Sequence, residues 1–238
     1  MPLPLRVPLH MSGRAKPHSQ VYFGMCAKSL MQYRSLDNRL QAMDAMSAEY
    51  NLAYAAAHEA SIKPVVFGAM CVEASLYDLS AALFGQTYAD EVDRIPPPAR
   101  FKRIAIDVDK VEPDPDLPIV KALTNLFLAR KKLVHYKSKP MPEQDWGTTL
   151  SEFQNDHAIH LLGIESSFRA PVLLSIFFDG NIFEDLRILP SFKLPEYWKS
   201  AIPVDLHDEV QSCIAESARS RGDALYLTTH GHAGRGAA

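Results

Sequence analysis

Helical spacing of apolar residues, interrupted by prolines, is the feature that most constrains how this chain can fold. Leucines, methionines and tyrosines recur every three or four positions over residues 35–60, and similar spacing recurs over 64–84 and 116–139. This period places apolar side chains on one face of an α-helix, whereas a half-buried strand would alternate apolar and polar residues. The spacing therefore predicts three long helices that share a core.

Capping residues and helix breakers indicate where these helices end. Ser35 or Asp37 suits the N-cap of the first helix, because a short polar side chain can accept a hydrogen bond from a free backbone N–H. Pro64 suits the first turn of the second helix, and Gly85 suits its C-cap. The third helix is expected to begin near Pro118, directly after the breaker-rich segment "EPDPD".

The rest of the chain has weaker helical patterns. Residues 99–107, "TLSEFQNDHAIHLLGI" and "DLHDEVQSCIAESARS" have helical character, while "RAPVLLSIFF" fits either a buried helix or a strand. We therefore expect an all-α fold, an antiparallel helical bundle with additional C-terminal helices. The proline-rich, basic residues 1–20 and the small, polar residues 223–238 are expected to form a flexible arm and tail around one domain over 21–222.

Composition excludes several classes of protein. The content of 47% hydrophobic and 22% charged residues is that of a soluble chain that buries a core. No apolar run approaches the roughly 18 residues of a membrane span, and the opening "MPLPLRVPLH" lacks the apolar core of a signal peptide. Three widely spaced cysteines without a CxxC pair argue against a disulfide framework or a zinc knuckle. We expect a cytoplasmic protein without membrane contact.

A local cationic patch lies at the end of the third helix, although the whole chain has a net charge of -3. No Asp or Glu occurs between residues 117 and 142, and five acids occupy 107–116. This separation of acidic from basic residues complements the helix macrodipole and needs no function to explain it. The basic C-terminal end would nevertheless attract a phosphate. The basic residues of the patch, with Lys121 further upstream, are Arg130, Lys131, Lys132, Lys137 and Lys139.

Arg130 interrupts the apolar face of the third helix. It follows Leu126 by four residues and precedes Leu133 by three, and residues at these spacings share one helix face. A guanidinium on such a face needs an acidic partner or a wet cleft. Glu73, which stands among apolar residues of the second helix, is the candidate, and a bidentate Arg130–Glu73 pair would satisfy both side chains.

His135 stands five positions beyond Arg130. At about 100° per residue, the two side chains would point roughly 140° apart on an ideal helix. They can converge on one ligand only if the last turn loosens or a second subunit supplies the missing partner. An arginine followed by a histidine at such a spacing is expected about once by chance in a chain of this composition. The position of the pair at the end of a helix is therefore stronger evidence than the spacing.

The second helix, "FGAMCVEASLYDLSAALFG", and the third, ending in "ARKKLVH", resemble the HEPN superfamily of small helical domains over roughly residues 36–140. The ending matches that family's Arg–x4-6–His motif. The resemblance implies a helical bundle that pairs through the motif helices, so that two copies of Arg130 and His135 face a shared cleft. Catalytic members are metal-independent endoribonucleases, and other members only bind nucleotides or partners.

By analogy with the catalytic members, His135 would take the proton of an RNA 2′-hydroxyl or protonate the leaving 5′-oxygen. Arg130 would stabilise charge on the phosphate, and its partner Glu73 is the third residue expected in the catalytic site. The lysines of the patch would bind the RNA backbone. Active members often carry Asn, Asp or His directly after the arginine, where this chain has Lys131, which cannot accept a hydrogen bond.

The expected function is a cofactor-free, homodimeric endoribonuclease with a toxin or defence role and an antitoxin protein as a further partner. Two alternatives stay open: a non-catalytic HEPN-like module that binds nucleotide, RNA or protein, and a helical scaffold with a purely structural Arg130–Glu73 pair.

A weaker candidate is a metal site in "EFQNDHAIH". Glu152, Asp156, His157 and His160 could reach one ion from a single helix. The chain has no HExxH motif and no obvious further ligand elsewhere. Surface or core histidines are the stronger interpretation, and we expect no bound metal.

Overall fold

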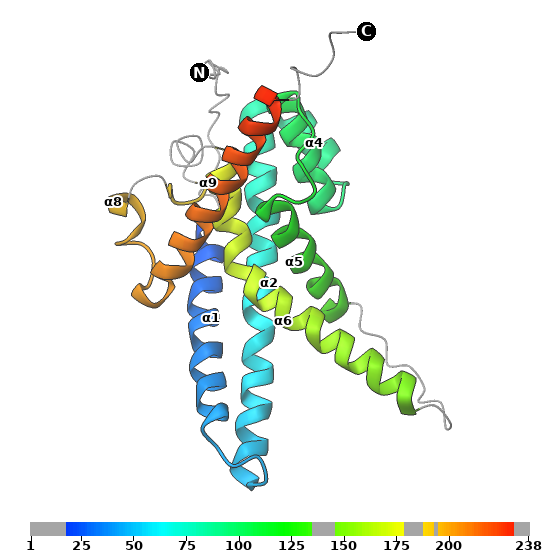
Figure 1. Ribbon diagram of the computed structural model, residues 1–238, viewed down its shortest axis with the longest axis vertical. Helices are drawn as coiled ribbons and strands as arrows, with labels where there is room; N and C mark the ends of the chain where they lie inside the picture. The colour runs from blue at the N-terminus through cyan, green and yellow to red at the C-terminus, as the bar shows by residue number, and fades with distance from the viewer. Residues whose placement is uncertain (1–17, 135–145, 179–187, 193–194, 231–238) are drawn as a thin grey trace.

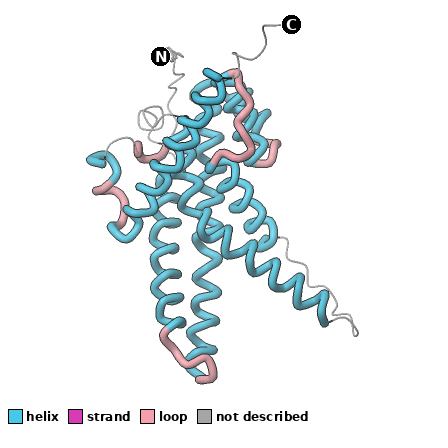
Figure 2. The backbone as a smooth tube through the Cα atoms, in the orientation of Figure 1, coloured by secondary structure: helices cyan, strands magenta, loops and turns pink. Residues whose placement is uncertain are grey.

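The computed structural model describes residues 18–134, 146–178, 188–192 and 195–230. Within these ranges every regular element is a helix and no strand occurs, so the predicted all-α helical bundle is confirmed (Figure 2). The helices are α1 (His18–Gln41), α2 (Ala48–Phe84), α3 (Gln86–Val92), α4 (Pro97–Asp109), α5 (Pro118–Val134), α6 (Trp146–Phe177), α8 (Pro195–Trp198) and α9 (His207–His230), with a short 3-10 helix η1 (Val204–Leu206).

Two antiparallel helix pairs build the bundle (Figure 1). The long helices α1 and α2 pack against each other, and α5 packs against α6 as a second pair. α2 contacts α6 where the two pairs meet, and below this point the pairs diverge into a fork. α4 lies at the upper end against α2 and α5, and α9 lies along α6.

α2 is the central helix of the core. Its predicted apolar seam is confirmed, because Val72, Leu76 and Leu79 are completely buried. Leu123 and Leu126 of α5 belong to the same buried cluster, as their spacing predicted. Each such side chain contributes about 1.5–3 kcal/mol by leaving water, so this cluster is the main source of stability.

Two glycines let the helices approach closely. A Cβ placed on Gly68 of α2 would lie 2.4 Å from the carbonyl oxygen of Ser167 in α6. A Cβ on Gly163 of α6 would lie 2.1 Å from the Cβ of Ala129 in α5. Contacts this close require glycine. The second contact holds α5 against α6 at Ala129, the residue next to Arg130.

The predicted helix over residues 35–60 is wrong, because the chain turns between α1 and α2. Asp44 Oδ1 accepts a hydrogen bond from the backbone N–H of Met46, and Ser47 Oγ accepts one from the backbone N–H of Tyr50. Such local bonds offer the backbone an alternative to the helix, and the second of them caps α2. Met46, which the pattern placed on an apolar stripe, is 91% exposed.

The predicted start of the second helix at Pro64 is also wrong, because α2 runs through this residue. A proline inside a helix removes one hydrogen bond and costs about 3 kcal/mol. Pro64 is buried, and its carbonyl accepts a hydrogen bond from Cys26 Sγ of α1. Packing of α2 against α1 offsets the cost. The predicted C-cap is confirmed at Gly85, whose φ is 91°.

Helices extend into both predicted flexible ends. α1 begins at His18, and its first turns bury Phe23, Cys26 and Leu30 at helical spacing. α9 reaches His230. The remaining parts of the predicted arm and tail, residues 1–17 and 231–238, lie outside the described residues.

The ambiguous run "RAPVLLSIFF" is helical and forms the end of α6. Val172, Leu173 and Leu174 are all buried, and a helix buried on every side shows no amphipathic period. α2 and residues 151–177 are long and apolar enough to cross a membrane, but 56% and 61% of their most apolar windows are buried inside the protein. Core helices pass the same test, so the cytoplasmic location stays a prediction.

Candidate functional site

The predicted ion pair between Arg130 and Glu73 is present. Arg130 lies near the C-terminal end of α5, and its Nη1 is 3.1 Å from Oε1 of Glu73 on α2. The two side chains are 36% and 31% exposed, so the pair lies at the edge of the core. A guanidinium carries five N–H donors, so the pair leaves donors for a further anion.

The packing of α5 explains this position. Leu126 and Ala129 are buried, and Lys131 on the other side of Arg130 is exposed. Arg130 therefore lies on the border between the buried and solvent faces of the helix. Val134, four residues beyond Arg130 at the end of α5, is 62% exposed, so the buried face of the helix ends before it.

Opposing influences act on the Glu73 carboxyl. Burial, the largest, raises its pKa above the ordinary value near 4.5, while the positive charges of Arg130 and then Arg100 lower it. Asp93 raises it slightly further, and the net change is upward. Removal from water therefore outweighs the nearby cations, which only partly offset its effect on the pKa of Glu73.

Arg100 of α4 belongs to this group, although the sequence analysis did not select it. Its side chain is only 5% exposed. Its Nε and Nη2 donate hydrogen bonds to the backbone carbonyls of Ile95 and Asp93. Its Nη1 lies 2.6 Å from Asp93 Oδ1 and forms an ion pair there, but the two groups are not aligned for a hydrogen bond. No sequence motif signals such a site, because most of these partners are main-chain carbonyls.

The predicted phosphate-binding lysines have different surroundings. Lys132 Nζ lies 2.6 Å from Asp156 Oδ1, which ties α5 to α6. Lys131 is exposed beside Arg130. His135, Lys137 and Lys139 lie outside the described residues. Of the three predicted catalytic residues, the structure thus brings Arg130 and Glu73 together.

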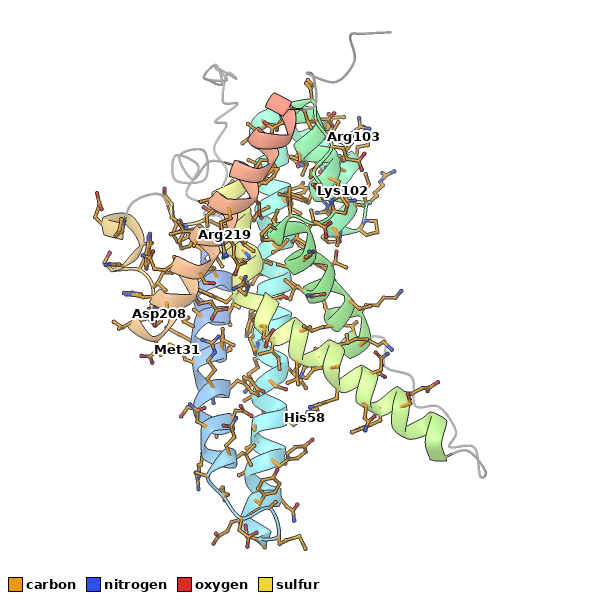
Figure 3. The ribbon with its side chains drawn as sticks, in the orientation of Figure 1. Met31, His58, Lys102, Arg103, Asp208 and Arg219 are labelled. Carbon is orange, nitrogen blue, oxygen red and sulfur yellow. The ribbon has the colours of Figure 1, made fainter. Side chains whose placement is uncertain are left out.

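The predicted metal candidates take part in other contacts. His160 Nε2 lies 2.7 Å from Ser61 Oγ of α2, and its ring centre is 6.1 Å from that of His58. Figure 3 labels His58 on the side of α2 that faces α6, in the fork between the two helix pairs. Burial, His58 and His157 lower the pKa of His160. Within the described residues, no group of three or more His, Cys, Asp and Glu side chains could hold a metal ion.

Two open depressions flank α5. One of about 620 Å³ lies between α4 and α5, with Lys102 and Lys121 in its lining. The other, of about 610 Å³, lies among α1, α5, α6 and α9 and contains Arg34 and Arg169. Neither depression includes Arg130 or Glu73. The ion pair therefore lies outside both depressions.

No protein-family model, curated protein or solved structure matches this chain. The resemblance to the HEPN superfamily therefore depends only on residues of α2 and on the Arg130–His135 spacing.

Proposed function

We propose that this protein is a metal-independent endoribonuclease of the HEPN type, with Arg130 and His135 in its active site. The observation that carries the proposal is the Arg130–Glu73 pair. A guanidinium at the edge of the core, held by a carboxylate and still partly exposed, suits the binding of a phosphodiester. It lies at the cation-rich end of α5, where a phosphate is attracted.

The proposed reaction uses the RNA 2′-hydroxyl as nucleophile. His135 takes its proton as the oxygen attacks the adjacent phosphorus, and a second proton goes to the leaving 5′-oxygen. Arg130 stabilises the negative charge that grows on the phosphate oxygens. The products are a 2′,3′-cyclic phosphate and a 5′-hydroxyl. An unperturbed histidine titrates near pH 6.5 and can perform either proton transfer near neutrality.

A second copy of the chain would complete the site. The Arg130–Glu73 pair lies outside both depressions described above. On an ideal helix, side chains at the spacing of Arg130 and His135 would point about 140° apart. A homodimer that pairs through α5 would place the histidine of one subunit near the arginine of the other. One histidine could then act as the base and the other as the acid.

A second candidate function is the binding of RNA, nucleotide or a protein partner without cleavage. It is favoured by Lys131, which cannot accept a hydrogen bond, and by the acidic partners that Arg130 and Lys132 already have. Under this alternative, RNA would bind through the same cationic end of α5 without reacting.

Cleavage of RNA in the presence of EDTA tests the proposal. The wild type should produce 2′,3′-cyclic ends, His135→Ala should produce none, and Arg130→Gln should react about 10²–10³-fold more slowly. Arg103→Gln, a change of an exposed arginine of α4 (Figure 3), should keep full activity. Circular dichroism checks that each variant is folded.

Cleavage that survives His135→Ala would contradict the assignment. Binding that weakens in Arg130→Gln, without products from the wild type, would support the non-catalytic candidate instead. The proposed toxin role predicts that expression of the wild type inhibits cell growth, whereas expression of His135→Ala does not.

A further inference from the structure

Polar side chains join α2 to α6 near the point where the two helix pairs diverge (Figure 1; Figure 3). Ser61 Oγ of α2 lies 2.7 Å from Nε2 of His160 on α6, and it donates a hydrogen bond to the backbone carbonyl of His58. The ring of His58 approaches that of His160, with the two centres 6.1 Å apart. Ser61 is only 3% exposed, so this contact lies inside the packing between the two helices.

These contacts determine which nitrogen of His160 carries the proton. The Ser61 hydroxyl has a single proton, which goes to the His58 carbonyl, so its oxygen accepts a hydrogen bond from the Nε2–H group of His160. Nδ1 is then the unprotonated nitrogen, and within the described residues it is buried without a hydrogen-bond partner. The other tautomer would place an N–H donor at this position, and a buried donor without an acceptor is costly.

Protonation of His160 would create that unpaired donor and add a positive charge. Burial, the largest influence, and then the charges of His58 and His157 lower the pKa of His160 below its ordinary value near 6.5. Both neighbouring histidines become cations themselves as pH falls, and among the described residues no charge of α1 or α5 acts on His160. The protonated form is therefore disfavoured as long as the contact with Ser61 is kept.

The carboxylates one turn before His160 and directly beside His58 already have cationic partners. Asp156 of α6 lies 2.6 Å from Lys132 Nζ of α5. Glu59 of α2 lies 3.5 Å from Lys63 Nζ on the same helix. Neither carboxylate accepts a hydrogen bond from Nδ1 of His160, so a proton on this nitrogen would have no anion to receive it.

We propose that His160 is a pH-sensitive switch between α2 and α6, which holds the two helices together when its imidazole is neutral and loosens them when the imidazole is protonated. Because the helices diverge beyond this contact, a change in its strength alters the angle between the two helix pairs (Figure 1). The inference does not depend on the proposed ribonuclease activity.

The direction of the pH dependence follows from the unpaired Nδ1. Above about pH 6.5 the histidine is neutral whether the contact is closed or open, and the contact keeps its full strength. As pH falls below this value, the open form takes up a proton before the closed form does. The equilibrium therefore moves toward the open form until pH has passed the lower pKa of the closed form.

Nitrogen-15 nuclear magnetic resonance of labelled histidine tests the chemistry of the switch in the wild type. His160 should carry its proton on Nε2 at pH 7.5 and should titrate below pH 6.5. The factor by which protonation favours the open form should equal the ratio of the acid dissociation constants of His160 in the closed and open forms.

Pulsed electron paramagnetic resonance between two spin labels tests the movement. Leu52→Cys on α2 and Phe153→Cys on α6 accept the labels, because these positions are 76% and 67% exposed. The three native cysteines are buried, so they are protected from labelling. The distance between the labels should be longer at pH 5 than at pH 7.5.

His160→Gln is the matched control, because its amide Nε2 can donate to Ser61 but does not titrate in this range. The label distance in this variant should be the same at both pH values. His157→Gln, which changes an exposed histidine of the same helix, should keep the pH-dependent increase.

Three results would overturn the inference: a label distance in the wild type that does not change with pH, an equal increase in His160→Gln, or a proton on Nδ1 of His160 at pH 7.5. The nitrogen-15 measurement needs no substitution, so it decides the question even if a variant fails to fold.

Discussion

The contact between α5 and α6 gives a sharp prediction for stability. In Gly163→Ala the new Cβ would lie 2.1 Å from the Cβ of Ala129. Carbon atoms in contact normally lie about 3.5–4.0 Å apart, so the two helices would have to separate by more than about 1 Å. Both colliding atoms are attached directly to the backbone, so no side-chain rotation can relieve the clash.

The magnitude follows from two opposing effects. Overpacking costs about 1–3 kcal/mol, and alanine recovers about 1 kcal/mol relative to glycine through its higher helix propensity. The rigid clash belongs at the upper end of the first range, so we expect Gly163→Ala to lose about 1–2 kcal/mol of unfolding free energy. Urea denaturation followed by circular dichroism measures this loss.

An exchange of the two residues provides the internal control. In Gly163→Ala combined with Ala129→Gly, the new Cβ would meet the Cα of residue 129 at 3.7 Å, an ordinary contact. The changes in helix propensity also cancel, so the double variant should lie within about 0.5 kcal/mol of wild type. Gly24→Ala in α1, where a new Cβ meets nothing within 4 Å, should gain up to about 1 kcal/mol. A Gly163→Ala protein as stable as wild type, or a double variant that loses the sum of both single losses, would refute the reasoning.

Three further predictions concern stability, all measured by urea denaturation. Ser47→Ala should lose about 1 kcal/mol as the N-cap bond of α2 disappears, and Ser47→Asp should lose much less; equal losses would contradict this. Arg130→Met or Glu73→Leu alone should cost about 1–2 kcal/mol, because each leaves one charge unpaired and the pair is about one third exposed. If the pair is purely structural, the double variant should be nearly neutral in stability. Because burial raises the Glu73 pKa, the stability that Glu73 contributes is fully present below about pH 4.5 and is lost as pH rises through its raised folded pKa. Wild type should therefore lose stability relative to Glu73→Gln over that range, and parallel pH curves would count against it.

The sequence predicts the Arg130–Glu73 ion pair better than it predicts the ends of the helices around it. Arg130 could be paired with Glu73 because an arginine on a buried face needs a partner, and few carboxylates stand among apolar residues. Helical periodicity and the cost of burying charge are sufficient to predict this pair. The exposed fraction of the Arg130–Glu73 pair cannot be predicted in this way, because it depends on how α5 tilts away from α2.

The misplaced helix ends have a common cause. Pro64 was interpreted as the beginning of a helix, because proline is disfavoured inside one, but tertiary packing carries α2 through it. The turn around Asp44 and Ser47 was missed because the apolar spacing continues across it. Hydrogen bonds from the backbone to the Asp44 and Ser47 side chains interrupt the helix here, although the apolar spacing continues.

Other contacts cannot be predicted from a single sequence. Arg100 has mainly carbonyl partners, which leave no pattern in side-chain identities. His58 and His160 meet although they are far apart in the chain, and neither lies in a motif that predicts the contact. Such pairs appear only once the crossing of α2 and α6 is known.

The sharpest test of the proposed endoribonuclease is whether cleavage requires the RNA 2′-hydroxyl. A short RNA and the same strand with a single 2′-deoxy substitution at the cleaved position are incubated with the protein and EDTA, and the products are identified by mass spectrometry. The proposed mechanism gives a 2′,3′-cyclic phosphate from the RNA and no cleavage at the 2′-deoxy position. Cleavage at that position, or cleavage that occurs only with a divalent metal, would contradict it.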